Sequence, residues 1–248
     1  MISCRLAGGL GNYMFQIGAA ATLAHKLRTE FVVDVSDHMV AHKDWSNYKD
    51  NIFRNVNFGT PNITNTHNFS GFPYSPLPLE DNIKLQGHPQ SEKYLDRNLI
   101  LDLFAVRLLV SDEMVSDFGI DENTVGVHVR RGDFLRLQNH HPPCTMEYYE
   151  QAMDIVGLDK TFYVFSDDFE WCSKNFKDCY IVEPSYDWLD LILMSRCAHN
   201  IIANSTFSWW SAWLNENENK TVIAPKQWFG PAKNLDTSDL LPKEWIII

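Results

Sequence analysis

The chain has 248 residues, of which 45% are hydrophobic, and a formal net charge of −11 at pH 7. This length allows one large domain or two small ones with a sizeable core. The acidic balance argues against nucleic acid or an anionic membrane as a partner, because those partners bind basic surfaces. An anion-binding site in this protein would therefore be a local basic pocket.

The sequence lacks the patterns of targeting and membrane segments. Its apolar runs fall short of the ~20 residues that cross a bilayer, and its first residues lack the order typical of a signal peptide. Five cysteines are scattered without a Cys-x-x-Cys pair, which favours reduced thiols in the cytosol over disulfides or zinc. We expect a cytoplasmic protein without a transmembrane segment, and peripheral contact with a membrane is compatible with this pattern.

The amino-terminal residues predict a strand, a glycine-rich loop, a helix and a second strand. These elements are expected at residues 2–6, 7–12, 13–28 and 31–35, in that order. The glycines permit a tight turn, and the helix that follows offers free N–H groups at its start. The loop, which includes Gly11 and Asn12, is therefore either a plain turn or an anion-binding loop.

The next stretch, residues 36–90, is rich in Asn, His, Pro and aromatic residues. Its prolines break any long helix, so we expect irregular structure with short elements, of a kind suited to lining a cleft. Residues 90–110 then predict a helix, because Leu95, Leu99 and Leu103 recur at helical spacing.

From residue 121 onward, strands alternate with helices, which predicts parallel βαβ units. Strands are expected at residues 124–129, 161–165, 180–182, 200–203 and 221–224. Helices are expected at residues 145–156, 169–175, 187–197 and 207–215. The loop after each strand then lies at the carboxyl edge of the sheet, where open α/β sheets bind ligands.

Two adjacent arginines follow a buried strand in the run His128–Asp133. Arg130 and Arg131 offer planar, permanently charged groups that fit phosphate oxygens. The alternative is a surface network of salt bridges with Asp133 and neighbouring acids. Because side chains alternate along a strand, one arginine is expected to face a ligand while the other braces the fold. His128 shares the phase of Arg130 by the same alternation.

A third loop, Asn204–Ser208, brings small hydroxyl and amide side chains to the start of a helix. Ser205 or Thr206 is expected to cap that helix. The first-turn N–H groups could also be shared with a phosphate. We expect both roles, since capping explains one residue of the run and not the whole of it.

Three further features each have two interpretations. Asp190 lies in an apolar run and is either a helix-start residue or a buried acceptor for the polar edge of a ligand. The tryptophans of Trp209–Trp213 are expected in the core, with sugar stacking as the alternative. Asp167 and Asp168 could bind a metal, but we expect none, because the arginines supply the positive charge that a metal would bring.

The motifs taken together resemble those of the galactoside alpha-1,2-fucosyltransferases. The segments that carry the resemblance are Gly8–Gln16, His128–Asp133 and Asn204–Trp210, with two later pieces at Ala224–Trp228 and Lys243–Trp245. The likeness runs in order from residue 8 to the end of the sequence. Residues 36–120 contain no matching motif.

The resemblance implies an α/β fold of the GT-B type, with two Rossmann-type parallel-sheet domains facing across a cleft. Residues 1–120 would form the acceptor-side domain and residues 121–248 the domain that binds GDP-fucose. Roughly the last 15 residues would pack back on the first domain. The resemblance also implies an inverting glycosyltransferase that needs no metal ion or other cofactor.

The motif match also assigns roles to individual residues. Arg130 would stabilise the charge that develops on the β-phosphate as GDP leaves, and Arg131 would orient the loop. His128 would lie against the nucleotide, and Asp190 would read the guanine. The implied nucleotide-binding set is Gly11, Asn12, His128, Arg130, Asp190, Asn204, Ser205 and Thr206.

The acceptor hydroxyl must lose a proton, unless the transition state is so dissociative that a base contributes little. Asp133 is the acid inside a matched motif and is the candidate base, with pairing to an arginine as its alternative role. His140 and His141, on a loop near the expected cleft, are further candidates.

The chain departs from the family in its shorter length and at Tyr13, where glutamine usually follows the asparagine. Both departures concern the acceptor side. The implied function is transfer of L-fucose from GDP-fucose to the 2-hydroxyl of a galactose-type glycan. One alternative is the same fold with another linkage or nucleotide-sugar donor. The other is a nucleotide- or glycan-binding module without turnover.

Overall fold

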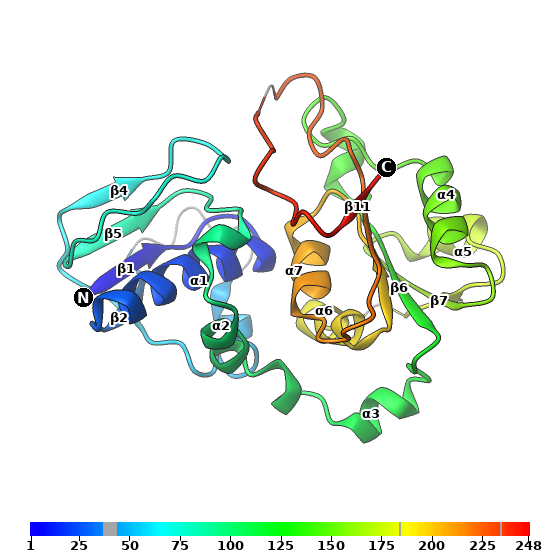
Figure 1. Ribbon diagram of the computed structural model, residues 1–248, viewed down its shortest axis with the longest axis horizontal. Coiled ribbons are helices and arrows are strands. Elements are labelled where there is room, and N and C mark those ends of the chain that lie inside the picture. The colour runs from blue at the N-terminus through cyan, green and yellow to red at the C-terminus, as the bar shows by residue number, and fades with distance from the viewer. Residues whose placement is uncertain (37–43, 184, 234) are drawn as a thin grey trace. The chain divides into compact units, whose positions relative to one another are not determined.

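The computed structural model describes residues 1–36, 44–183, 185–233 and 235–248 (Figure 1). The chain forms two compact units. Unit 1 comprises Met1–Leu109 and Leu235–Pro242, and unit 2 comprises Val110–Asn234 and Lys243–Ile248. The chain therefore leaves unit 1, builds most of unit 2, returns to unit 1 and ends in unit 2. Both units are α/β domains with parallel sheets, as predicted.

Unit 1 is built on a five-stranded sheet with the order β3-β2-β1-β5-β4. The strands are β1 (Ile2–Arg5), β2 (Phe31–Asp34), β3 (Phe58–Gly59), β4 (Thr66–Asn68) and β5 (Ile83–Gln86). The central strand is β1, in which Ile2 pairs in parallel with both Phe31 and Ile83. Strands β1 and β2 confirm the expected pair. The stretch predicted as irregular contributes three short strands to the sheet, and its residues 37–43 lie outside the described residues.

Helix α1 (Leu10–Leu27) packs against β1 and follows the glycine-rich loop (Figure 1). Gly8 has a φ of 95°, and a Cβ there would lie 2.3 Å from Nδ2 of Asn12, so this position requires glycine. The Gln16 side chain accepts a hydrogen bond from the N–H of Ala7 (3.0 Å) and donates to the carbonyls of Ala7 and Gly87 (both 3.1 Å). Gln16 thereby ties the loop to the end of β5.

The prediction of one helix across residues 90–110 is wrong. The structure has 3₁₀ turns at Glu92–Tyr94 and Val106–Leu108 on either side of helix α2 (Arg97–Phe104). Asp96 is extended and caps α2 by accepting from the N–H of Leu99 (3.1 Å). Ala105 ends the helix in the left-handed conformation, with a φ of 47°. Leu99 and Leu103 lie in α2, whereas Leu95 precedes its cap, so the helical spacing extends beyond the helix itself.

The late segment Leu235–Pro242 belongs to unit 1. There Asp239 accepts a hydrogen bond from the N–H of Tyr74 (2.8 Å) and forms an ion pair with Lys93. The residues that follow return to unit 2, where β11 (Ile246–Ile247) pairs in parallel with β10 (Val222–Ala224).

Unit 2 contains a six-stranded parallel sheet with the order β11-β10-β9-β6-β7-β8. Its other strands are β6 (Thr124–Val129), β7 (Thr161–Ser166), β8 (Tyr180–Ile181), β9 (His199–Ile201) and β10 (Val222–Ala224). Its helices are α3 (Asp112–Asp117), α4 (Met146–Val156), α5 (Phe169–Asn175), α6 (Asp187–Arg196) and α7 (Thr206–Leu214). The alternation predicted from residue 121 onward is confirmed, whereas β11 and α3 were not predicted.

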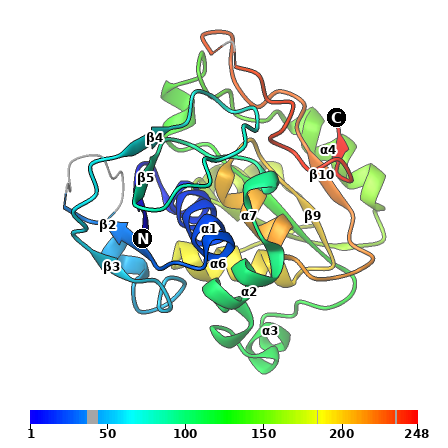
Figure 2. The same cartoon turned by 60° about the vertical axis from the view of Figure 1, so that its left-hand side comes forward.

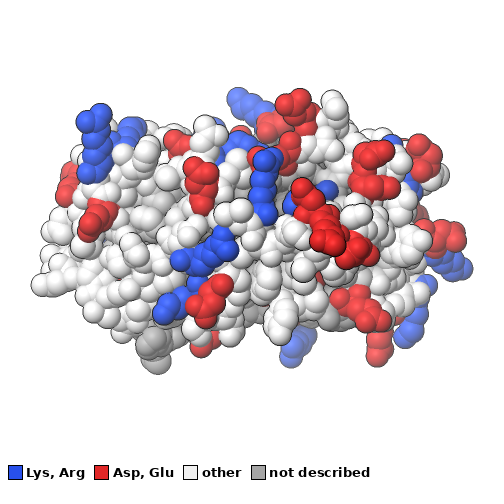
Figure 3. All heavy atoms as spheres, turned by 90° about the horizontal axis from the view of Figure 1, so that it is seen from below, with Lys and Arg blue, Asp and Glu red and all other residues white. Residues whose placement is uncertain are grey.

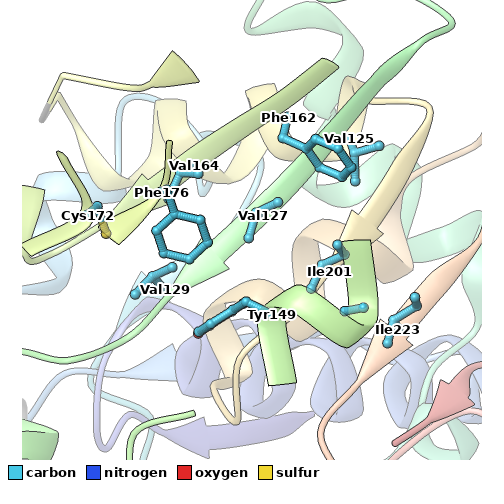
Figure 4. Packing of buried hydrophobic residues seen from close by; sticks show 11 residues of the cluster. Val125, Val127, Val129, Tyr149, Phe162, Val164, Cys172, Phe176, Ile201 and Ile223 are labelled. Atoms are coloured by element: carbon cyan, nitrogen blue, oxygen red, sulfur yellow. The ribbon is translucent and has the colours of Figure 1, made fainter. Parts of the chain in front are cut away.

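Helices cover both faces of this sheet. On one face, Val125, Val127 and Val129 of β6 pack against residues of α4 and α5, including Tyr149 and Cys172 (Figure 4). On the other face lie α6 and α7, which pack against each other (Figures 1 and 2). Because side chains alternate along a strand, the valines fill the first face and leave the even-numbered residues of β6 to the second.

The second face holds a buried cluster of tryptophans. Trp209 is fully buried, and its ring lies 5.3 Å from that of Trp210, 5.9 Å from that of Trp213 and 5.7 Å from that of Trp245. This confirms the core interpretation of the cluster over sugar stacking.

The surface charge is mixed. Figure 3 shows lysine and arginine side chains interspersed with aspartate and glutamate over one face of the molecule. Among the residues that the structure describes, no helix is both long and apolar enough to span a bilayer.

Candidate active site

The direction in which successive strands are added to the sheet of unit 2 changes at β6. From β6 the chain adds β7 and β8 on one side, and it then places β9 on the other side of β6. The helix after β6, α4, covers one face, and the helix after β9, α7, covers the opposite face. Open α/β sheets bind ligands outside the carboxyl ends of the strands at such a point. The loops His128–Asp133 and Asn204–Ser208 both leave the sheet there.

Arg130 stands at this edge between two carboxylates. Its Nη2 donates to Oδ1 of Asp133 and its Nη1 to Oδ2 of Asp167, both at 2.5 Å. The Arg130 side chain is 34% exposed, so solvent or a ligand can reach it. A Cβ on Gly132 would lie 2.5 Å from Oδ2 of Asp167. The absence of a side chain at position 132 therefore lets Asp167 approach Arg130.

Arg131 contacts other parts of the same edge. Its Nε donates to Asp168 (3.0 Å), its guanidinium stacks on the ring of Trp171 at 3.8 Å, and its N–H donates to Asp167 (2.8 Å). These contacts fix the loop after β6 to the start of α5. The geometry supports the expected division in which Arg131 braces the fold. The structure also contains the network of salt bridges that was the alternative interpretation, because three carboxylates pair with the two arginines.

His128 lies on the same face of β6 as the helix α7. Its ring is 5.1 Å from the ring of Phe207, and the side chain is 5% exposed. Burial, with a smaller contribution from Arg130, lowers the pKa of His128 to about 3. The imidazole is therefore neutral at physiological pH, and it packs beneath the site.

The start of α7 has the predicted cap. Ser205 accepts a hydrogen bond from the N–H of Phe207 (3.3 Å), and Thr206 begins the helix. Ser208 is buried and donates to the carbonyls of Ala203 and Ser205 (both 3.3 Å). Ser205 and Thr206 are partly exposed at the start of α7, which follows β9 at the carboxyl edge of the sheet.

Asn204 makes structural contacts through its side-chain amide, and its role in nucleotide binding stays a prediction. Its side chain is buried, and its Nδ2 donates to the carbonyls of Pro142 and Trp228, both at 3.0 Å. Both amide hydrogens are thus committed to backbone acceptors. Asn204 joins the loop after β6 to the loop after β10.

Those two loops bring Lys233 against His141, and the sequence predicted only the histidine as a site residue. The Nζ of Lys233 lies 2.8 Å from Nε2 of His141. The His141 ring stacks on Phe134 at 4.9 Å, and the guanidinium of Arg130 lies 5.3 Å from the centre of the Phe134 ring. His141 was a candidate base. No local pattern distinguishes Lys233 from other lysines.

Asp190 occupies the first turn of α6, which begins at the same edge of the sheet. Its Oδ1 accepts a hydrogen bond from the Ser185 hydroxyl (2.6 Å). Burial, reinforced by the charge of Asp187, raises the pKa of Asp190 to about 6. The position of Asp190 confirms the helix-start interpretation, and its role as an acceptor for a ligand stays a prediction.

The predicted residues of unit 1 lie in the first turn of α1. Gly11 is buried, and Asn12 accepts a hydrogen bond at Oδ1 from Nε2 of Gln90 (2.8 Å). Tyr13 is fully buried, with its ring 6.3 Å from that of Tyr48. The tyrosine that replaces the family glutamine is therefore a core residue of unit 1.

Asp167 and Asp168, the two residues considered as metal ligands, both contact arginines. Asp167 and Asp168 accept hydrogen bonds from Arg130 and Arg131. In the described part of the chain, no three His, Cys, Asp or Glu side chains are grouped as metal ligands would be.

Comparison with known proteins places this architecture in one family. The profile of glycosyl transferase family 11 matches residues 2–248. The O-antigen biosynthesis glycosyltransferase WbnK of Escherichia coli is 32% identical over 305 aligned positions, which cover 99% of both chains. An alpha-1,2-colitosyltransferase of Escherichia coli is 27% identical and covers 100% of this chain and 99% of its own.

Two further likenesses are a partial sequence match and a solved structure. The human galactoside alpha-(1,2)-fucosyltransferase 1 is 33% identical over 103 positions, which cover 36% of this chain and 28% of the human one. The solved structure of the NodZ alpha-1,6-fucosyltransferase co-crystallized with GDP has a TM-score of 0.52 at 15% identity, covering 85% of this chain and 91% of its own. It shares the GT-B-like fold. Since the family profile spans nearly the whole sequence, the chain belongs to glycosyl transferase family 11.

Proposed function

We propose that this protein transfers L-fucose from GDP-fucose to the 2-hydroxyl of a galactose-type glycan, with inversion and without a metal ion. The observation that carries the proposal is the position of Arg130 at the switch point of unit 2. Two of the five N–H donors of its guanidinium bond to carboxylates. The other three have no partner among the described residues and can bind phosphate oxygens.

In this mechanism the protein stabilises the leaving group. As the bond between the sugar and the diphosphate breaks, negative charge builds on the β-phosphate, and Arg130 is already oriented by Asp133 and Asp167 to meet it. Preorganised charge of this kind lowers the barrier because it does not have to reorient during the reaction. Ser205 and Thr206 at the start of α7 supply further phosphate contacts.

Asp133 is the proposed base for the acceptor hydroxyl. Its Oδ1 accepts from Arg130, while its side chain is 52% exposed and has a second carboxylate oxygen. An acid in this position could accept a proton on one oxygen while the other holds the arginine. His141 is less suited to the task, because burial and the nearby Lys233 lower its pKa to about 4.

The relatives support the linkage more than the donor. A relative that covers the whole chain is named an alpha-1,2-colitosyltransferase, and a partial one a galactoside alpha-(1,2)-fucosyltransferase. Both names specify an alpha-1,2 linkage, but they differ in the sugar transferred. The donor must therefore be tested directly.

The direct test is an assay of purified protein with GDP-fucose, other GDP-sugars and UDP-sugars against a panel of galactose-terminated glycans. We expect an alpha-1,2-fucosylated product, identified by linkage analysis, and an unchanged rate when EDTA is present. Transfer of a different sugar, or another linkage, would overturn the donor or acceptor assignment. GDP binding without transfer to any glycan would favour a binding module, and loss of activity in EDTA would contradict metal independence.

Asp190 gives the donor site an expected pH dependence. A guanine edge donates to an ionised carboxylate, and the pKa of Asp190 is raised to about 6. The ionised fraction falls about tenfold between pH 7 and pH 5, so the affinity for GDP-fucose should weaken about tenfold over this range. Calorimetric titration of GDP-fucose at several pH values measures this directly.

The control for this prediction is Asp190→Asn. The amide does not titrate, so the variant should bind GDP-fucose weakly and with little change between pH 7 and pH 5. GDP-fucose is preferable to GDP because it lacks a terminal phosphate that titrates near pH 6. An equal pH dependence in wild type and variant would show that Asp190 does not read the base.

A further inference from the structure

The charges around Arg130 leave the proposed site short of positive charge. Arg130 and Arg131 pair with Asp133, Asp167 and Asp168, so two cations face three carboxylates. A sugar-nucleotide diphosphate brings two more negative charges. Like charges at close range disfavour binding, so another cation is needed near this cluster.

Lys233 is a cation without a carboxylate partner among the described residues. Its Nζ contacts Nε2 of His141 at 2.8 Å and lies 5.1 Å from the centre of the Phe229 ring. Both contacts are with uncharged groups, since burial and the nearby Lys233 hold His141 neutral. Burial lowers the pKa of Lys233, as expected for an ammonium that has lost water without gaining an anion.

Aromatic contacts link Lys233 to Arg130. His141 stacks on Phe134 with 24° between the ring planes, and Arg130 lies over the Phe134 ring. Asp133 and Arg130 both act on the charge of His141, which places the histidine in the same electrostatic environment. Lys233 and Arg130 thus belong to one continuous cluster at the carboxyl edge of the sheet.

The backbone fixes the two loops that make this contact. The N–H of Gly230 donates to the carbonyl of His140 (3.0 Å), and that of Ala232 to the carbonyl of Asn139 (2.9 Å). A Cβ on Gly230 would lie 2.4 Å from the carbonyl oxygen of Asn139, so only glycine allows this approach. Asn204 joins the same two loops through its buried amide.

We propose that Lys233, held in place by His141, is a second cationic contact for the diphosphate of the nucleotide donor. His141 is a positioning residue, since its neutral Nε2 accepts a hydrogen bond from the ammonium. Its ring stacks on Phe134 and contacts Phe229 edge-on. This inference rests on the proposed function, because it takes a nucleotide diphosphate as the ligand.

The first test is Lys233→Met, with Lys226→Met as a matched control. Lys226 is an exposed lysine at the start of the same loop. Calorimetry with GDP and with guanosine separates the phosphate from the base. We expect Lys233→Met to weaken GDP binding about tenfold, as for loss of one charge-assisted contact, and to leave guanosine binding unchanged. Lys233→Arg should restore most of the affinity, and Lys226→Met should match wild type.

The second test addresses the positioning role. His141→Phe keeps a ring between Phe134 and Phe229 but removes the acceptor for Lys233. It should weaken GDP binding, and the double variant with Lys233→Met should be no weaker than Lys233→Met alone, because both changes act through one contact. Thermal unfolding of each variant identifies any that fail to fold, and Lys233→Met, at a partly exposed site, remains informative if His141→Phe does not fold.

The outcomes separate the two claims. If wild type binds no GDP, the proposed function fails before Lys233 is tested. If wild type binds GDP and Lys233→Met binds it within twofold of wild type, the inference about Lys233 is wrong while the proposed function stands. A variant that binds GDP normally but has a raised KM for the glycan would assign Lys233 to the acceptor, and this too would overturn the inference.

Discussion

Replacing Arg130 by alanine is expected to reduce fucosyl transfer by about 10²–10³-fold at saturating donor, as for loss of one preorganised charge at the position where charge develops. The fold should persist, because the guanidinium is partly exposed and its partners are carboxylates that water can solvate. Product formation measured in single-turnover experiments reports the chemical step directly, and circular dichroism verifies the fold.

Two variants sharpen this prediction. Arg130→Lys keeps the charge but loses the planar fork that bridges Asp133 and Asp167, so it should recover only part of the rate. Arg136→Ala removes an exposed arginine from the same loop and should leave the rate unchanged. If Arg130→Ala turned over donor at a rate near that of wild type, the assignment of Arg130 as the leaving-group stabiliser would be wrong.

Trp209→Ala should lower the free energy of unfolding of the protein by about 3–5 kcal/mol, the usual cost of removing a buried aromatic side chain. The indole is fully buried and contacts three other tryptophans, one of which, Trp245, comes from the end of the chain. The neighbours cannot collapse into the cavity without breaking their own ring contacts. Urea denaturation monitored by tryptophan fluorescence and by circular dichroism measures the change.

Trp209→Phe serves as the graded comparison and should cost less, because a ring still fills most of the space. Trp188→Ala removes a partly exposed tryptophan from α6 and should cost about 1 kcal/mol or less. A loss below about 1 kcal/mol for Trp209→Ala would mean that this cluster adapts to a cavity and contributes little to the core of unit 2.

The Rossmann-type fold of unit 2 was predictable because the sequence patterns that indicate its strands and helices are local. Strand β6 is a short, fully buried segment in which valines alternate with other residues, and the residues that follow it switch at once to arginines and an acid. Local alternation also placed His128 and Arg130 on one face, and the contact between His128 and Phe207 confirms this for the histidine. The parallel arrangement follows from the helices between strands, so the shared edge of the loops follows from the sequence alone.

What could not be predicted depends on contacts between distant residues. Strand β5 has four residues between proline-rich segments, and it is a strand because Ile83 pairs with Ile2 at the centre of the sheet. The motif does not reveal that Nδ2 of Asn204 donates to the carbonyls of Pro142 and Trp228, which lie far away in the sequence. Lys233 becomes distinctive once Gly230 brings its loop against that of His141.

The return of Leu235–Pro242 to unit 1 has a consequence for biosynthesis. Asp239, which binds Tyr74 and Lys93, is translated after Val110–Asn234, which belong to the other unit. At 5–20 residues per second, roughly 6–25 s separate synthesis of Leu109 from that of Leu235. On the ribosome, unit 1 therefore begins to emerge first but cannot be completed until Leu235–Pro242 has been synthesised. A nascent chain stalled before Leu235 should show Tyr74 and Lys93 without their contacts to Asp239.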